Sequence, residues 1–226
     1  MNYATLFETV KGYVENDFPE VTWTNPAGDG TVAFTGTEQI NTFIQQAEER
    51  IYNGVQILDL RKNVTGSCTT DNKYLSVPAD WLATYSIAVV DGDGAYNFLL
   101  NKDVNFIREA FPTPTDTGLP THYAMFDKDS FILGPTPDAD YVVELHYFYY
   151  PESIVTAGTT WLGDNFDSVL LYGCLLEAYT FMKGEQDVIA NYQKRYDEAM
   201  LQLKMLSEGK NRQDMYRTAQ VRYPVR

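Results

Sequence analysis

The chain has 226 residues and a mass of 25.7 kDa, and 44% of its residues are hydrophobic. This apolar content is sufficient for a folded core and too high for a disordered chain. The formal net charge of −14 argues against a protein whose main task is to bind a nucleic-acid backbone. Two cysteines are too few for a secreted disulfide scaffold, and no segment reaches the roughly 20 apolar residues of a membrane span. We therefore expect a soluble protein of a reducing compartment.

Two amphipathic helices are predicted in the first 54 residues. Apolar residues recur every three or four positions from Tyr3 to Val14. Residues 22–36 are rich in Gly, Asn and Pro and are predicted as a turn-rich connection that cannot sustain a helix. A second helix follows, with a capping box at Thr35 and Glu38 and a left-handed stop at Asn53–Gly54. Its predicted apolar face consists of Ile40, Phe43, Ile44, Ala47 and Ile51.

Short β-prone runs separated by Gly, Pro, Asp and Asn follow the second helix. They are Val55–Leu60, Lys73–Val77, Thr84–Val90, Ala95–Leu100, His122–Phe126, Ser130–Leu133 and Tyr141–Tyr150. The turns at Asp91–Gly94 and Asp127–Asp129 lie between neighbouring runs, which favours an antiparallel sheet over a βαβ nucleotide fold. A short helix over Asp103–Phe111 interrupts the runs.

The last third of the chain is predicted to be helical. Residues Asp164–Met182 are apolar on nearly all sides, which predicts a helix covered by its neighbours. After a break at Lys183–Glu185, a heptad-type seam follows, formed by Ile189, Tyr192, Tyr196, Ala199, Leu203 and Leu206. Residues 210–226 carry five basic residues and one acid, a net charge of +4, whereas residues 1–209 carry 12 basic and 30 acidic residues, a net charge of −18. This last segment is too polar to fold alone, so we predict an extended arm.

Together these segments predict an α+β fold, namely a helical bundle with an inserted antiparallel β-domain and an extended C-terminal arm. The N-terminal helices of the bundle occupy residues 1–54, and the β-module occupies residues 55–152. A helical hairpin at residues 153–208 completes the bundle, and the basic arm covers residues 209–226.

The sequence carries no pattern typical of a catalytic site. Both histidines, His122 and His146, lie in β-prone runs, and there is no nucleophile elbow, phosphate loop or Gly-x-Gly-x-x-Gly turn. The segment Asp91–Gly94 resembles the start of a calcium loop, but the EF-hand pattern fails at Ala95 and Tyr96, so a hairpin turn is favoured. The cysteine and histidine spacings do not fit a zinc site. We therefore assign no catalytic, cofactor-binding or metal-binding residue and expect no enzyme.

Glu177 is the only charged residue between Asp167 and Lys183, on a helix that is otherwise apolar. A buried carboxylate is costly without a partner, so it needs a cation or a hydrogen-bond donor. We expect an ion pair with Lys194 or Arg195 across the helical hairpin. The alternative is a partner in a neighbouring subunit.

Aromatic residues occupy both faces of the predicted strand that ends at Pro151. One face would present Tyr141, Val143, Leu145, Tyr147 and Tyr149. The other face would still carry Val142, Phe148 and Tyr150. Such a strand is either covered by a partner on its second face or part of a simple sandwich core, and both interpretations remain open. In the first interpretation, Tyr147 and Tyr149 contact a neighbouring subunit.

Several segments occur in a familiar order along the chain. They are the helix Phe43–Ile51, the strand Lys73–Asp80, Thr121–Met125 with Phe131–Pro137, the aromatic strand ending in Tyr149–Glu152, and Leu171–Tyr179. This order resembles the head-to-tail adaptor (connector) proteins of tailed bacteriophages, over most of residues 3–208. Residues 22–36 have no match in the resemblance.

The resemblance implies a structural virion protein at the head–tail junction, made in the host cytoplasm. It implies a ring of twelve copies beneath the portal, a C-terminal arm that grips the portal, and contact with a downstream tail or nozzle protein. DNA would pass through the ring without specific binding, and no cofactor or membrane would be involved. The predicted arm contacts are the charged Lys210, Arg212, Arg217, Arg222 and Arg226 and the aromatic Tyr216 and Tyr223.

Two other functions remain open. One is a polysaccharide-degrading tail enzyme that uses acids of the β-module and an aromatic surface on which sugars stack. The other is a receptor-binding tail module whose aromatic strand contacts the receptor.

Overall fold

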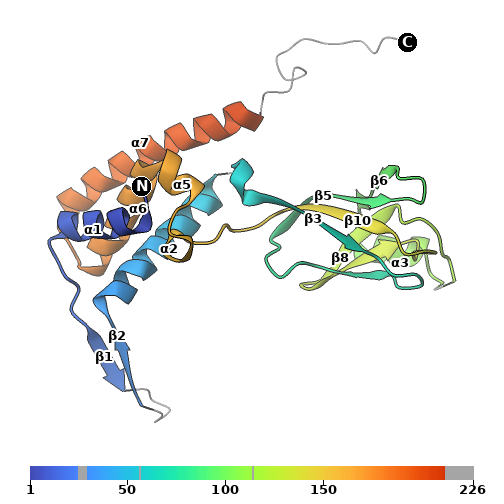
Figure 1. The fold of residues 1–226 in the computed structure, drawn as a ribbon, viewed down its shortest axis with the longest axis horizontal. Helices are drawn as coiled ribbons and strands as arrows, with labels where there is room; N and C mark the ends of the chain where they lie inside the picture. The colour runs from blue at the N-terminus through green and yellow to red at the C-terminus, as the bar shows by residue number, and fades with distance from the viewer. Residues whose placement is uncertain (25–29, 56, 114, 212–226) are drawn as a thin grey trace. The chain divides into compact units, whose positions relative to one another are not determined.

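The structure is a computed structural model that describes residues 1–24, 30–55, 57–113 and 115–211 (Figure 1). The chain forms two compact units. The helical unit comprises Met1–Leu58 together with the chain from Pro151 onward, and the β unit comprises Asp59–Tyr150. Helices dominate the first unit and strands the second, so the fold is α+β, as predicted.

Helix α6 lies at the centre of the helical unit. It packs against α1, α2 and α7, and its residues from Val169 to Ala178 are mostly buried, which confirms the prediction of a helix covered by neighbours. The predicted N-terminal helix is also confirmed. The helices of this unit are α1 (Tyr3–Val14), α2 (Gly36–Gly54), α4 (Ile154–Ala157), α5 (Trp161–Asn165), α6 (Asp167–Phe181) and α7 (Gln186–Asn211).

Helix α2 begins with the predicted capping box. The Thr35 side chain accepts a hydrogen bond from the Glu38 backbone N–H, and the Glu38 carboxylate accepts one from the Thr35 N–H at 2.8 Å. These contacts satisfy two N–H groups that the first turn leaves without helical partners. The five residues of the predicted apolar face are all buried.

The predicted end of the helix at Asn53–Gly54 is confirmed, but the predicted left-handed conformation there is wrong. Gly54 is the last residue of α2, and the capping residue Val55 has an extended backbone. A Cβ atom at position 54 would lie only 2.5 Å from the Met200 Cε of α7. A larger residue at position 54 would therefore require the flexible end of the Met200 side chain to shift.

The connection between α1 and α2 contains two strands that the sequence analysis did not predict. Strands β1 (Val21–Thr24) and β2 (Thr31–Phe34) pair as an antiparallel hairpin. The Gly, Asn and Pro residues that indicated a turn-rich connection lie between the two strands or flank them. The flanking Val, Thr, Trp and Phe residues favour strands.

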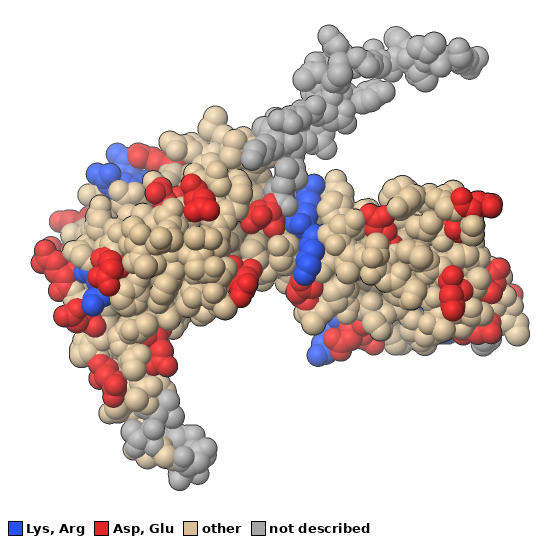
Figure 2. All heavy atoms as spheres, viewed as in Figure 1, with Lys and Arg blue, Asp and Glu red and all other residues tan. Residues whose placement is uncertain are grey.

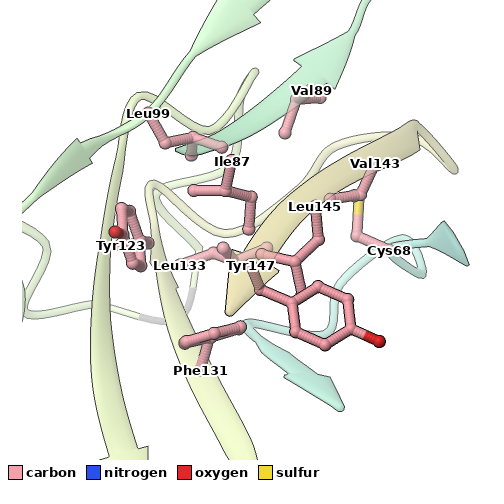
Figure 3. Close-up of a cluster of buried hydrophobic side chains, with 10 residues drawn as sticks. All are labelled: Cys68, Ile87, Val89, Leu99, Tyr123, Phe131, Leu133, Val143, Leu145 and Tyr147. Carbon is pink, nitrogen blue, oxygen red and sulfur yellow. The ribbon is translucent and has the colours of Figure 1, made fainter. Parts of the chain in front are cut away.

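The β unit contains two four-stranded sheets, in the orders β3-β10-β5-β6 and β4-β9-β8-β7. All strand pairs are antiparallel except β7 with β8. Residues from both sheets form one apolar core, including Ile87, Leu133 and Leu145 (Figure 3). The strands are β3 (Arg61–Ser67), β4 (Tyr74–Ser76), β5 (Ala83–Val90), β6 (Tyr96–Phe98), β7 (Leu100–Asn101), β8 (His122–Asp127), β9 (Ser130–Gly134) and β10 (Val142–Phe148).

Both predicted hairpin turns are confirmed, since Asp91–Gly94 joins β5 to β6 and Asp127–Asp129 lies between β8 and β9. The predicted short helix is α3 (Val104–Ala110), which buries Ile107 against the β unit. The run Ala95–Leu100 does not form one strand. It divides at Leu99, whose N–H donates to Ile87 in the first sheet, while the next N–H donates to Thr121 at the second sheet.

Two further strand predictions need correction. The run Val55–Leu60 was expected to be a strand but ends in a 3-10 helix, η1 (Leu58–Leu60). Strand β3 was missed because only Val64 of its seven residues packs on the core, so it shows no clear apolar alternation.

Helix α7 buries a seam that differs from the predicted one at its C-terminal end. Tyr196 and Leu203 are buried as expected, but Leu206 is 38% exposed and Ser207 is buried instead. The helix continues to Asn211, so residues 209–211, predicted as the start of the extended arm, are helical. A single glycine at position 209 costs only about 1 kcal/mol in a helix, which the preceding turns tolerate.

Candidate interaction surface

The buried carboxylate of Glu177 is paired within its own subunit. Its Oε1 contacts Nη2 of Arg50 on α2. The Glu177 side chain is only 14% exposed, so the predicted need for a cation is confirmed. The expected partners were wrong, because Arg195 lies over the Tyr172 ring instead, 5.8 Å from its centroid. The charge of Glu177 therefore does not require a neighbouring subunit.

A second buried carboxylate, Glu48 on α2, was missed. It is 3% exposed and accepts a hydrogen bond from the Ile154 backbone N–H at 2.9 Å. Burial raises the pKa of Glu48, against the opposing effect of hydrogen bonds from Ser153 and Ile154. Glu48 lies at helical spacing from the buried Ile44 and Ile51, and this spacing could have identified it.

The two histidines lie in different sheets and in different surroundings. His122 Nδ1 lies 2.8 Å from Thr121 Oγ1, and its ring lies near Phe106. The His146 ring packs edge-on against Tyr85, with centroids 4.9 Å apart. Among the residues that the structure describes, no three His, Cys, Asp or Glu side chains are grouped to hold a metal ion. No helix in the described ranges has the length and hydropathy of a membrane span.

The Asp91 carboxylate serves its own hairpin turn. It accepts hydrogen bonds from the backbone N–H groups of Ala95 at 2.9 Å and Asp93 at 3.1 Å and from the Asn97 side chain at 3.0 Å. These hydrogen bonds, led by the one from Ala95, lower the pKa of Asp91. The interpretation as a hairpin turn is therefore confirmed.

Tyr147 belongs to the core of the β unit. Its side chain is 1% exposed and lies among the buried side chains of this core (Figure 3). Its hydroxyl donates to Asp80 Oδ1 at 2.8 Å. The other oxygen of Asp80 accepts a hydrogen bond from Lys62 Nζ at 2.7 Å. A neighbouring subunit cannot reach this ring, so the prediction that Tyr147 forms a subunit contact is wrong. Tyr149 is only partly buried, with the Lys62 ammonium 5.2 Å from its ring centroid, and its role in a subunit contact stays a prediction.

The opposite face of the first sheet is aromatic and open to solvent. We call it the outer aromatic face. It consists of Tyr85, Tyr96, Phe98, Val142, His146 and Phe148. Phe98 is 69% exposed and Tyr96 is 57% exposed. The guanidinium of Arg61 lies over the Tyr85 ring, 4.3 Å from its centroid, in a cation–π contact.

A hollow of about 270 Å³ lies in the outer aromatic face. It is lined by Ser86, Ala88, Tyr96, Phe98, Glu144 and His146. The Glu144 carboxylate accepts a hydrogen bond from the Asn63 side chain at 2.5 Å. Exposed aromatic residues surrounded by polar groups are typical of protein interfaces. The burial of only one face of β10 is therefore established, whereas its coverage by a partner stays a prediction.

The predicted arm contacts lie largely outside the described residues. The backbone of Lys210 belongs to α7, but its side chain is not described, nor are Arg212, Tyr216, Arg217, Arg222, Tyr223 and Arg226. Asp and Glu side chains are scattered over the visible face of each unit (Figure 2). The acidic character of residues 1–209 is thus a property of the surface.

One family model matches the sequence. It is described as SU10 adaptor protein, and the match covers residues 1–224. No curated protein matches the sequence.

Proposed function

The chain belongs to the SU10 adaptor protein family, and we propose from this that it forms a ring joining the portal of a phage capsid to the tail. It is a phage adaptor, a structural protein of the head–tail junction, and its family is not a known enzyme family. In the proposed ring, each subunit contributes a helical bundle with an inserted β-module. We propose twelve copies, by resemblance to other head-to-tail adaptors.

The family match is the observation that carries this proposal. It extends over residues 1–224, so both the helical unit and the β unit fall within it. Neither unit therefore needs a separate function, such as sugar cleavage or receptor binding, to account for its presence.

The surface charge supports a conduit for DNA. Residues 1–209 carry 12 basic and 30 acidic residues. A channel lined with lysine and arginine would bind phosphates with release of counterions and would retard the moving DNA. An acidic body avoids this retention, so DNA passes without specific binding.

The C-terminal arm is the proposed portal contact. Residues 210–226 are basic, opposite in charge to the rest of the chain. A basic segment can dock in an acidic groove of a partner ring, because opposite charges attract across an interface. Arginine and tyrosine are enriched among the residues that dominate binding, and this supports Arg212, Arg217, Tyr216 and Tyr223 as contacts. The downstream tail or nozzle protein would bind elsewhere on the ring.

Truncation after Asn211 tests the arm. The variant keeps all of α7, so we expect it to fold, to give the same circular dichroism spectrum, and to lose co-sedimentation with portal-containing particles. A matched control replaces Lys102, Arg108 and Lys128 of the β unit with glutamine, which removes exposed positive charge from residues that do not belong to the arm. The control should co-sediment normally. Normal co-sedimentation of the truncated chain would contradict the assignment of the arm.

A further inference from the structure

The hollow in the outer aromatic face is built by three neighbouring strands. Strand β5 lies between β10 and β6 (Figure 1). Ala88 of β5 pairs with Glu144 on one side and with Phe98 on the other, and residues that pair directly lie on the same face of a sheet. The small side chains of Ser86 and Ala88 therefore form the floor of the hollow, between the larger side chains of β10 and β6.

One wall of the hollow is aromatic and the other carries a carboxylate. The aromatic wall consists of Tyr96 and Phe98, both more than half exposed, and the opposite wall consists of Glu144 and His146. Oε1 of Glu144 accepts the hydrogen bond from Asn63. Within the described ranges, Glu144 Oε2 accepts no hydrogen bond, and no Lys or Arg forms an ion pair with this carboxylate. The wall thus carries a negative charge without a compensating cation.

The same face already holds one arginine over aromatic rings. At the opposite edge of the sheet, the Arg61 guanidinium of β3 lies 4.3 Å from the ring centroid of Tyr85 and 5.4 Å from that of Phe148. A guanidinium is planar, stacks on aromatic rings and is more weakly hydrated than the ammonium group of lysine. In the described part of the chain, no cation covers the second aromatic pair, Tyr96 and Phe98.

We propose that the hollow binds an arginine side chain of the downstream tail protein. The guanidinium would lie against the rings of Tyr96 and Phe98 and pair with the Glu144 carboxylate. The exposed Asp93 lies in the turn that precedes β6 and adds negative charge at this edge of the sheet. Charge complementarity therefore favours a cation over an anionic side chain. The inference rests on the proposed position between portal and tail, and it names a surface that holds the tail.

The arginines of the chain itself have other partners. All four arginines within residues 1–209 contact a carboxylate or an aromatic ring of their own subunit, namely Arg50, Arg61, Arg108 and Arg195. A neighbouring copy thus offers no uncommitted arginine from this part of the chain. The other arginines lie in the arm, whose proposed partner is the portal. In the proposed assembly, the downstream tail protein is the partner left to supply the arginine.

The chemistry of the hollow can be tested on the full-length chain without phage particles. The probe is N-acetyl-arginine amide, and its matched control is N-acetyl-citrulline amide, in which a neutral urea group replaces the guanidinium. With isotope-labelled Tyr and Phe side chains, the arginine probe should shift the NMR signals of Tyr96 and Phe98 in a saturable manner. The citrulline probe should bind about tenfold more weakly. Equal binding of the two probes, or unshifted signals of these rings, would overturn the site.

Two substitutions and two controls locate the bound probe. Glu144→Gln removes the charge of the hollow, while its amide oxygen can still accept from Asn63. It should weaken the arginine probe about tenfold, and Phe98→Ala should weaken it about threefold. Glu109→Gln and Phe106→Ala change an exposed acid and an exposed aromatic residue of α3, which packs on the second sheet, and should leave binding unchanged. Equal binding by Glu144→Gln and Glu109→Gln would contradict the assignment.

Assembly on phage particles tests the source of the arginine. Rings of the Glu144→Gln chain should bind portal-containing particles normally and retain purified tail protein about tenfold less than rings of the Glu109→Gln chain, measured by co-sedimentation. Equal retention, or loss of the ring from the portal instead, would overturn the tail protein as the source. Failure of the unmodified chain to join portal-containing particles would overturn the proposed function, whereas the result with the arginine probe would stand.

Discussion

Arg50 of α2 forms an ion pair with Glu177 of α6, and this pair joins two segments that are far apart in the sequence and belong to the same helical unit. Glu177 is mostly buried, whereas the Arg50 side chain is 47% exposed. The arginine therefore keeps part of its hydration while it neutralises a carboxylate on the central helix. Loss of the arginine would leave the carboxylate buried without its cation.

Removal of one partner should cost more than removal of both. We expect Arg50→Met to lower the free energy of unfolding by about 1–3 kcal/mol, because Glu177 then lies in an apolar surrounding without compensation. The double variant Arg50→Met with Glu177→Leu should be more stable than Arg50→Met alone. Urea unfolding of the full double-mutant cycle measures the coupling. Additive effects would show that the two side chains do not stabilise each other.

The pH dependence of stability should report on Glu48. Its pKa is raised in the folded state by burial, so the folded protein binds the proton more tightly than the unfolded chain. Protonated Glu48 therefore stabilises the folded protein. This stabilisation is fully present below pH 4.5, the ordinary pKa of a glutamate, and is lost as the pH rises through the raised pKa of the folded state. Glu48→Gln should remove this decline while its amide oxygen still accepts from the Ile154 N–H. Urea unfolding at several pH values compares the variant with the unmodified chain, and an unchanged pH profile would contradict the assignment.

Glu48→Ala serves as the contrasting variant for the same site. It leaves the buried Ile154 N–H without an acceptor, at a cost of about 1–3 kcal/mol. Glu48→Gln should be clearly more stable than Glu48→Ala at neutral pH. Equal stability of the two variants would mean that the hydrogen bond contributes little.

Tyr147 should behave as a core residue. Tyr147→Phe removes only the hydrogen bond to Asp80, and we expect a loss of about 0.5–1.5 kcal/mol in the free energy of unfolding with normal ring assembly. Tyr147→Ala should cost about 3–5 kcal/mol because it empties part of the core. Thermal unfolding of the two variants and light scattering of their assemblies test this. Loss of assembly by a fully stable Tyr147→Phe variant would contradict a core role.

The native thiols should be inert in the folded protein. Cys68 is 1% exposed and Cys174 is 0% exposed, and burial raises the pKa of both thiols. The thiolate is the reactive form, so neither should react with an aromatic disulfide reagent until the chain is unfolded. Titration before and after addition of urea measures this. Fast reaction of the native protein would show that one thiol is accessible.

The sequence carries strong signals where local chemistry decides the structure. The capping box at Thr35 and Glu38 and the apolar spacing from Ile40 to Ile51 act within one helix, so α2 could be predicted from them. The Asp91 turn is likewise local, because the carboxylate binds groups at most six residues away.

Long-range packing could not be predicted in the same way. The sequence indicates that α2 stops at Gly54, but it does not show that the Met200 side chain of α7 approaches this glycine. The partner of Glu177 depends on which helix crosses α6, and the sequence around Glu177 does not encode that choice. Strand β3 is held by its backbone pairing with β10, so the pattern of its side chains gives little indication that this segment is a strand.

The position of the protein in the phage particle tests the central claim most directly. Lys128→Cys introduces an exposed thiol in the turn between β8 and β9, while the two native cysteines stay buried. Particles that incorporate this variant, labelled with maleimide-linked gold before assembly, can be viewed by electron microscopy. We expect gold at the junction of head and tail in each labelled particle. Gold at the distal tip of the tail would contradict it.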